Sequence, residues 1–152
     1  MNKREIVRKQ LDEKILSVHG ATKVSVPTSG WIYAIRYSLN MSLRQLGQRL
    51  SITAQGVKDI EKREKDGSIS LRVLRQVAAA LGMKFYYGFI PEDGTLEAMI
   101  ENRSMELAEN IVHRTSIQMN LEDQAVSQER LKAEVSDMAK TFAKDLPKLL
   151  WD

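Results

Sequence analysis

The segment Ser42–Glu61, which reads SLRQLGQRLSITAQGVKDIE, constrains the fold more than any other part of the chain. Ser42 and Gln45 have the spacing of a capping box, which predicts a helix over 43–50. Thr53 stands three residues beyond that helix and is a good N-cap, so a second helix is expected to start directly after it. Two short helices joined by so tight a turn must cross sharply, which is the geometry of a helix-turn-helix.

Apolar residues within this segment are spaced so that the two helices can pack together. Leu46 and Leu50 on the first helix are expected to contact Val57 and Ile60 on the second, because the four side chains can then bury a shared apolar surface. Gly47 takes the position that faces the second helix most closely, where only a small residue fits.

The rest of the chain also has helical periodicity. Apolar residues at three- and four-residue steps predict helices over 2–18, 31–39, 54–62, 71–81, 95–119 and from about residue 121 or 123 to 144. The aromatic run Lys84–Ile90 (KFYYGFI) ends at Pro91 and is expected to form one short β-strand. We therefore expect an all-α fold with one strand, divided into an N-terminal helix and linker over 1–29, a helix-turn-helix part over 30–91 and an acidic helical part over 92–152.

Charge is distributed unevenly along the chain. Residues 1–90 carry sixteen Lys or Arg against seven Asp or Glu, a net +9, whereas residues 91–152 carry seven against thirteen, a net −6. This asymmetry favours a basic surface that binds a polyanion and an acidic part that binds something else.

Several classes of protein are excluded by residues that the sequence lacks. The chain has no Cys, no apolar run near the length of a membrane span and no apolar stretch of the kind that marks a signal peptide. We therefore expect a cytoplasmic protein without disulfides or a membrane interaction. Its two His are far apart and no nucleophile stands beside a base, so we expect no enzyme, no metal and no cofactor.

A helix-turn-helix places its second helix in the major groove of DNA. Gln55 on that helix can donate and accept at once, which suits a bidentate contact with adenine, and Lys58 can reach a guanine or a phosphate. Asp59 can accept from cytosine or merely repel a phosphate, and the two interpretations weigh equally. The full set of candidate DNA contacts is Ser42, Leu43, Arg44, Thr53, Ala54, Gln55, Gly56, Lys58, Asp59, Lys62, Arg63 and Lys65.

Residues 31–82 resemble the lambda-repressor-like, or xenobiotic-response-element, helix-turn-helix family. The resemblance is carried by Ile35-Arg36, Ser42-xxx-Leu46-Gly47, Thr53-xxx-Val57-xx-Ile60-Glu61 and Leu74-xx-Val77-Ala78-xx-Leu81. The sequence departs from the family pattern twice, with Gly47 in place of the usual Ala and Ser51 in place of the usual turn Gly. A non-Gly residue with positive φ at that turn costs about 1 kcal/mol.

A wider set of motifs is similar to the mobile mystery protein A family. The motifs are GWIYAIRYSLNMSLRQLGQRL, EKREKDGSISL, YYGFIP, MNLEDQAV and LLWD, which span most of the chain beyond residue 29. The resemblance implies a neighbouring gene for a protein with a Fic-type AMP-transferase domain, and an antitoxin role for this chain. One class of Fic inhibitors carries Ser/Thr-xxx-Glu-Gly/Asn, which this sequence lacks. Neutralisation of a Fic-type partner would therefore need a different contact.

Other residues are expected to have roles in structure or in protein contacts. Arg36 and Glu61 occupy positions that meet in the lambda-repressor-like fold, so a semi-buried structural ion pair is expected between them. Tyr86 and Tyr87 of the expected strand are candidates for contact across a two-fold axis. Further candidates for a dimer or partner contact are Met99, Leu107 and Ile111.

The sequence thus predicts a non-enzymatic, sequence-specific regulator, a repressor or an activator. We expect it to bind double-stranded operator DNA as a homodimer on an inverted repeat and to regulate an operon shared with a Fic-type partner. The alternative is a protein-interaction inhibitor of that partner whose helix-turn-helix does not bind DNA.

Overall fold

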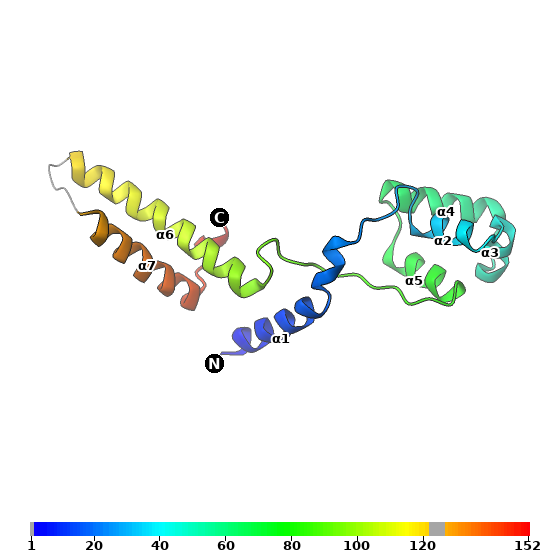
Figure 1. The fold of residues 1–152 in the computed structure, drawn as a ribbon, viewed down its shortest axis with the longest axis horizontal. Coiled ribbons are helices and arrows are strands. Elements are labelled where there is room, and N and C mark those ends of the chain that lie inside the picture. The colour runs from blue at the N-terminus through cyan, green and yellow to red at the C-terminus, as the bar shows by residue number, and fades with distance from the viewer. Residues whose placement is uncertain (1, 122–126) are drawn as a thin grey trace. The chain divides into compact units, whose positions relative to one another are not determined.

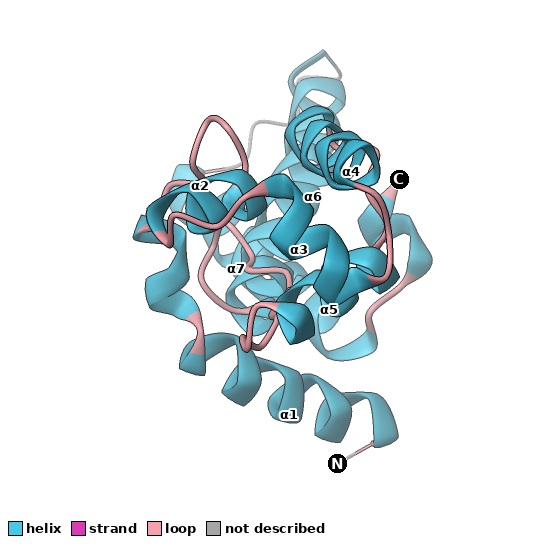
Figure 2. Ribbon diagram, turned by 90° about the vertical axis from the view of Figure 1, so that its right-hand side faces the viewer, coloured by secondary structure: helices cyan, strands magenta, loops and turns pink. Residues whose placement is uncertain are grey.

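The regular structure of the chain is helical, which confirms the expected all-α class (Figure 2). The computed structural model describes residues 2–121 and 127–152. Its elements, in chain order, are α1 (Lys3–Ser17), η1 (His19–Lys23), α2 (Trp31–Ser38), α3 (Leu43–Leu50), α4 (Ala54–Asp66), α5 (Leu71–Ala80), α6 (Leu96–Leu121), α7 (Gln128–Asp145) and η2 (Lys148–Trp151) (Figure 1). No helix within these described ranges has the length and apolar character needed to cross a bilayer.

The chain divides into two compact units. The central unit is Ala21–Gly88, and the terminal unit joins Met1–Gly20 to Phe89–Asp152. The central unit carries eleven Lys or Arg against four Asp or Glu, a net +7, and the terminal unit carries twelve against sixteen, a net −4. The N-terminal helix thus belongs to the same unit as the acidic C-terminal helices.

Local capping defines α3 and α4 at the positions that the sequence predicts. Ser42 Oγ accepts the N–H of Gln45 at 3.1 Å, and Gln45 Oε1 accepts the N–H of Ser42 at 2.8 Å, which completes the capping box. Thr53 Oγ1 accepts the N–H of Gly56 at 3.0 Å at the start of α4. Ser51, in the turn between the helices, has φ 57°, the left-handed conformation that costs a non-Gly residue about 1 kcal/mol.

The end of α4 lies beyond the expected end at Lys62. The helix continues to Asp66, and Gly67 with φ 83° is its C-cap. Residues 63–66 contain no helix breaker, so the helix ends only where a glycine can adopt the left-handed conformation.

A small apolar core holds α2 to α5 together. Its centre is Ile32, Leu46, Val57 and Val77, each at most 3% exposed. Partly buried side chains pack around it: Met41, Leu43, Leu50, Ile60, Ile69, Val73, Leu74, Ala80 and Leu81. The apolar contact expected between the two helices of the segment Ser42–Glu61 is part of this core.

The close approach at Gly47 is as tight as the sequence predicts. A Cβ atom on Gly47 would lie 2.7 Å from the carbonyl oxygen of Ile52, a contact that real structures essentially never show. The main chain of the turn therefore leaves no room for the Ala that the lambda-repressor-like pattern usually has there.

The terminal unit is built on a hairpin of α6 and α7, which lie side by side (Figure 1). Its most buried side chains are Ile100, Ser104, Ala108, Val112, Ala139 and Leu150. Arg103 Nε donates to the carbonyl of Leu150 at 2.6 Å and so holds η2 against α6. The expected start of the second helix at about residue 121 is wrong, because Leu121 is the last residue of α6. The alternative start at residue 123, and much of the MNLEDQAV motif, lie outside the described residues.

Two polar links attach α1 to the start of α6. The carboxylate of Asp12 accepts the N–H of Leu96 at 2.7 Å and that of Glu97 at 3.2 Å, so it caps α6 from another helix. Arg8 Nε also pairs with Glu97 Oε2 at 2.7 Å. These links explain why the N-terminal helix belongs to the terminal unit.

The strand expected over Lys84–Ile90 is absent from the structure. Residues 83–90 have no regular secondary structure, and the described part of the chain contains no strand. A strand is stable only when a neighbouring strand pairs with its backbone, and a single copy of this chain supplies none. The aromatic composition is therefore not sufficient to form a strand within one chain.

Candidate nucleic-acid interface

One face of α4 carries a row of exposed polar and basic side chains. Gln55, Lys58, Lys62 and Lys65 follow one another at three- and four-residue steps, so they lie along the same side of the helix. With Tyr33 of α2 they line an open hollow of about 640 Å³. We call these four α4 residues the basic row.

The amide of Gln55 is oriented by a neighbour on the same helix. Its Nε2 donates to Asp59 Oδ1 at 3.1 Å, one turn further along. This bond occupies one of the two amide hydrogens, and it leaves the second hydrogen and Oε1 able to bind another molecule. Asp59, for which the sequence allowed two roles, therefore lies in position to orient Gln55.

The first turns of α3 and α4 expose backbone donors beside their caps. Thr53 satisfies the N–H of Gly56, whereas the N–H groups of Ala54 and Gln55 have no partner among the described residues. The N–H groups of Leu43 and Arg44 at the start of α3 are likewise without a partner there. Such donors, together with the helix dipole, favour binding of a phosphate.

Two basic residues, the candidate Arg63 and also Arg49, lie away from the basic row. Arg63 lines a separate hollow with Gly56 and Ile60 of α4 and Val73 of α5, so it belongs to another side of the helix. Arg49 Nη1 donates to the carbonyl of Ala80 at 3.1 Å and thereby links α3 to the end of α5. The structure therefore brings Lys58, Lys62 and Lys65 together and separates them from Arg63.

Arg36 and Glu61 form the ion pair that the family resemblance implies. Arg36 Nε donates to Glu61 Oε1 at 2.5 Å and Nη2 donates to Glu61 Oε2 at 3.3 Å, while the two side chains are only 11% and 9% exposed. Arg36 Nη1 also donates to the carbonyl of Met41 at 2.8 Å. One guanidinium thus fixes α2 to α4 and to the residues that precede α3.

Glu64 is a structural residue that the sequence interpretation missed, because it lies beyond the expected end of the helix at residue 62. Its carboxylate accepts the N–H of Trp31 at 2.7 Å and that of Ile32 at 2.8 Å, so α4 caps the first turn of α2. The N-cap position of α2 is Gly30, which has φ 87° and no side chain to do this. A helix start without a capping side chain is the signal that a distant carboxylate is needed.

A carboxylate at the end of α4 has a shifted pKa. Ser68 donates to Asp66 Oδ1 through its hydroxyl at 2.5 Å and through its backbone N–H at 3.0 Å. The side-chain hydrogen bond is the main cause, with the backbone bond second, of an Asp66 pKa below its ordinary value.

The candidates for protein contact are distributed over both units. Tyr86 and Tyr87 of the central unit are 78% and 61% exposed. On α6, Met99 is 39% exposed, whereas Leu107 and Ile111 are half-buried and offer less surface to a partner.

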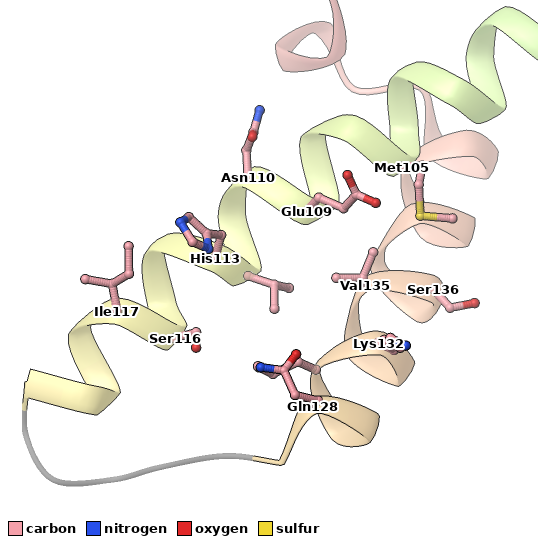
Figure 3. A pocket seen from close by; sticks show the side chains of 12 residues that line it. Met105, Glu109, Asn110, His113, Ser116, Ile117, Gln128, Lys132, Val135 and Ser136 are labelled. Carbon is pink, nitrogen blue, oxygen red and sulfur yellow. The ribbon is translucent and has the colours of Figure 1, made fainter.

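Two hollows of the terminal unit differ in character. One, of about 410 Å³, is an apolar groove between α1 and α6, lined by Val7, Leu11, Leu96, Met99 and Ile100, with Trp151 at one side and Lys3, Arg4 and Arg8 beside it. The other opens between α6 and α7, and its lining includes both polar side chains, such as Glu109, His113 and Lys132, and apolar ones, such as Met105, Ile117 and Val135 (Figure 3). Across the described ranges, no group of three or more His, Asp or Glu is placed to hold a metal ion.

Comparison with protein-family models, with curated proteins and with solved structures found no match to this chain.

Proposed function

We propose that the protein is a sequence-specific regulator that binds double-stranded DNA through α4 of the central unit. The observation that carries the proposal is the basic row: one Gln and three Lys on a single exposed face of a helix whose N-terminus is capped and exposed. A buried ion pair fixes that helix to α2, and the unit has a net charge of +7.

Each part of the row has a distinct task in this proposal. Lys58, Lys62 and Lys65 attract phosphates, which supplies affinity that does not depend on sequence. Gln55 approaches a base edge, where its Oε1 and remaining N–H match the N6 and N7 groups of adenine. Asp59 holds the Gln55 amide in that orientation through the 3.1 Å bond.

The first test is loss of base readout. A preferred duplex is selected from a random pool with the full chain, and the affinity of Gln55→Ala for that duplex and for a scrambled one is measured. We expect the variant to lose about 1–3 kcal/mol on the selected duplex and much less on the scrambled one. Gln10→Ala, an exposed Gln on α1, is the matched control. Equal losses on the two duplexes would contradict direct readout by Gln55.

The second test separates phosphate contacts from base contacts. Lys62→Ala should weaken binding to every duplex and reduce the slope of log affinity against log salt by about one. Lys132→Ala, which removes an exposed Lys from α7, is the control for loss of one positive charge. A change in slope that is equal in both variants would show that net charge, rather than the basic row, determines the effect.

Asp59→Ala should raise the affinity for DNA in general and lower the preference for the selected duplex. Removing the carboxylate takes a negative charge from the row, so we expect tighter binding to scrambled DNA. The Gln55 amide also loses its orienting partner, so preference for the selected duplex should fall. A variant that keeps the full preference would mean that Asp59 does not position Gln55.

A second candidate activity is binding of a Fic-type partner, as the mobile mystery protein A resemblance implies. The observation that favours a protein contact is the apolar groove between α1 and α6, in which Met99 is 39% exposed. We propose that the terminal unit makes this contact, and that the partner and this chain share an operon which the chain regulates as a homodimer.

Capture of a purified Fic-domain protein, if one is encoded beside this gene, tests the second candidate. Leu11→Asp, in the groove, should abolish capture and leave binding to the selected duplex intact. Capture that survives this change but is lost in Lys62→Ala would place the contact on the central unit. Capture of the partner without preference for any duplex would favour the alternative, an inhibitor that does not bind DNA.

A further inference from the structure

The segment that follows α5 exposes both its backbone and its rings. From Lys84 to Ile90 no backbone N–H or C=O group has a hydrogen-bond partner within the described part of the chain. Tyr86 is 78% exposed and Phe89 is 89% exposed, an unusual state for a Phe side chain. A row of unpaired backbone groups flanked by aromatic side chains is a surface that another strand can pair with.

Side chains on one side of this segment contact other residues of the chain. The rings of Phe85 and Tyr87 stack at a centroid distance of 6.0 Å, as side chains two residues apart do on one side of an extended chain. The guanidinium of Arg75, on α5, lies 5.3 Å from the centre of the Tyr87 ring. Phe85 also lines a hollow of about 340 Å³ with Trp31 and Leu74. The side chains of Phe85 and Tyr87 therefore contact other residues of the central unit.

We propose that a second copy of this chain pairs with Lys84–Ile90 to form a two-stranded antiparallel sheet centred on Tyr87. The inference deepens the homodimer of the proposed function and rests on it for its role in DNA binding. In an antiparallel pair, opposite side chains lie on the same face, so a two-fold axis must pass through a residue paired with its own copy. The unpaired run begins after Met83, whose N–H is bonded to Ala78, and ends before Pro91, so its midpoint is Tyr87.

This register is self-complementary at each position that carries a ring. Phe85 stands opposite Phe89 of the second copy, and Tyr87 stands opposite itself, so the inner face gains three aromatic pairs. On the outer face, Tyr86 stands opposite Gly88, an arrangement in which the ring covers the bare glycine backbone. The partner copy's Phe89 would lie beside Phe85, at the hollow that Phe85 and Trp31 line. The aromatic composition then forms a strand in the dimer, although it forms none in a single copy.

Because the sequence has no Cys, a disulfide between two introduced cysteines reports which residues of the two copies lie opposite each other. Opposite residues in an antiparallel pair have Cα atoms about 4.5–5.5 Å apart, within the reach of a disulfide. Tyr87→Cys should therefore cross-link to its own copy in the full chain, without DNA, about tenfold faster or more than Tyr37→Cys, because pairing raises the effective concentration. Tyr37 is 71% exposed on α2 and serves as the control for random collision.

Further variants keep the proposal testable if Tyr87→Cys weakens the pair. Phe85→Cys and Phe89→Cys should each stay monomeric on a non-reducing gel, whereas a mixture of the two should give a cross-linked heterodimer. Cross-linking of Tyr86→Cys or Gly88→Cys alone would show a different register and overturn the proposal. A wild-type chain that sediments as a monomer, with all variants cross-linking at the Tyr37→Cys rate, would also overturn it.

Failure of this inference and failure of the proposed function are distinguishable. If Tyr87→Cys does not cross-link but the wild-type chain still prefers the selected duplex, the pairing is wrong and DNA binding stands. If Tyr87→Cys cross-links as expected but no duplex is preferred, the pairing stands and the proposed function is wrong.

Discussion

The two units of this protein are held together in different ways. The central unit joins four helices of 8 to 13 residues, and a buried ion pair ties two of them together. The terminal unit rests on two longer helices, and its third helix, α1, has no buried residue at all. On α1, Ile6, Val7 and Leu11 are 43–45% exposed.

This difference has a physical basis in helix length. In a short helix, the unpaired N–H and C=O groups at the two ends are a large share of the backbone, so the helix depends on partners elsewhere in the fold. A long helix satisfies most of its own backbone and can leave an apolar side uncovered. The central unit is therefore built to hold one helix in a defined orientation, which a DNA contact needs, whereas the terminal unit retains apolar surface that a protein contact can use.

The largest effect should come from breaking the ion pair of the central unit. Glu61→Ala leaves the buried guanidinium of Arg36 without a counter-charge, with the Met41 carbonyl and the Tyr33 ring as its remaining neighbours, which should cost about 3–5 kcal/mol. Thermal unfolding of the full chain measures the loss, and the double variant Arg36→Met, Glu61→Leu should recover much of it. An unchanged melting temperature in Glu61→Ala would show that the pair does not hold the unit.

The next effect concerns two glycines of the helix-turn-helix segment. Gly47→Ala drives a Cβ against the Ile52 carbonyl and should cost about 1–3 kcal/mol, because a backbone shift is required. Gly56→Ala is the matched control, since its new Cβ would meet only side-chain atoms at 3.3 Å or more and helix propensity favours Ala. Chemical denaturation that ranks the two variants in the reverse order would contradict the close approach of α3 to the turn.

A pair of equivalent changes compares the two units directly. Glu64→Ala removes the cap of α2, and Asp12→Ala removes the cap of α6, so each should cost about 0.5–2 kcal/mol. We expect hydrogen exchange to speed up in α2 for the first variant and in α6 for the second. Faster exchange in both units after either change would show that the units are not stabilised separately.

The smallest effect should be a pH dependence at the end of α4. The pKa of Asp66 is lowered in the folded chain, so its contribution is present above the ordinary Asp pKa and is lost as the pH falls through the folded value. Asp66→Ala should therefore melt slightly below wild type at neutral pH, and the gap should close in acid. A difference in melting temperature that widens as the pH falls would contradict a lowered pKa of Asp66. Ser68→Ala, which removes the donating hydroxyl, should show the same trend.

Features set by neighbouring residues could be predicted from the sequence. The starts of α3 and α4, the left-handed Ser51 and the need for glycine at position 47 each depend on a few adjacent residues. The helix-end caps from Glu64 and Asp12 could not be predicted, because each carboxylate acts on a helix more than 30 residues away.

The separation of Arg63 from the basic row follows from the angular position of each residue on α4, which the sequence interpretation did not use. The aromatic composition of residues 84–90 predicts a strand because aromatic residues are common in strands. A strand also needs a second strand that pairs with its backbone, and composition does not show whether one is present. The features that could not be predicted from the sequence therefore depend mainly on contacts between distant residues or between copies of the chain.

The central claim is that α4 of the central unit, and not the terminal unit, contacts DNA. Lysine acetylation of the full chain, read by mass spectrometry with and without the selected duplex, tests it with internal controls. The account predicts that DNA protects Lys58, Lys62 and Lys65, whereas Lys132, Lys140 and Lys144 of α7 react at unchanged rates. Protection of the α7 lysines with unchanged reactivity along α4 would contradict it.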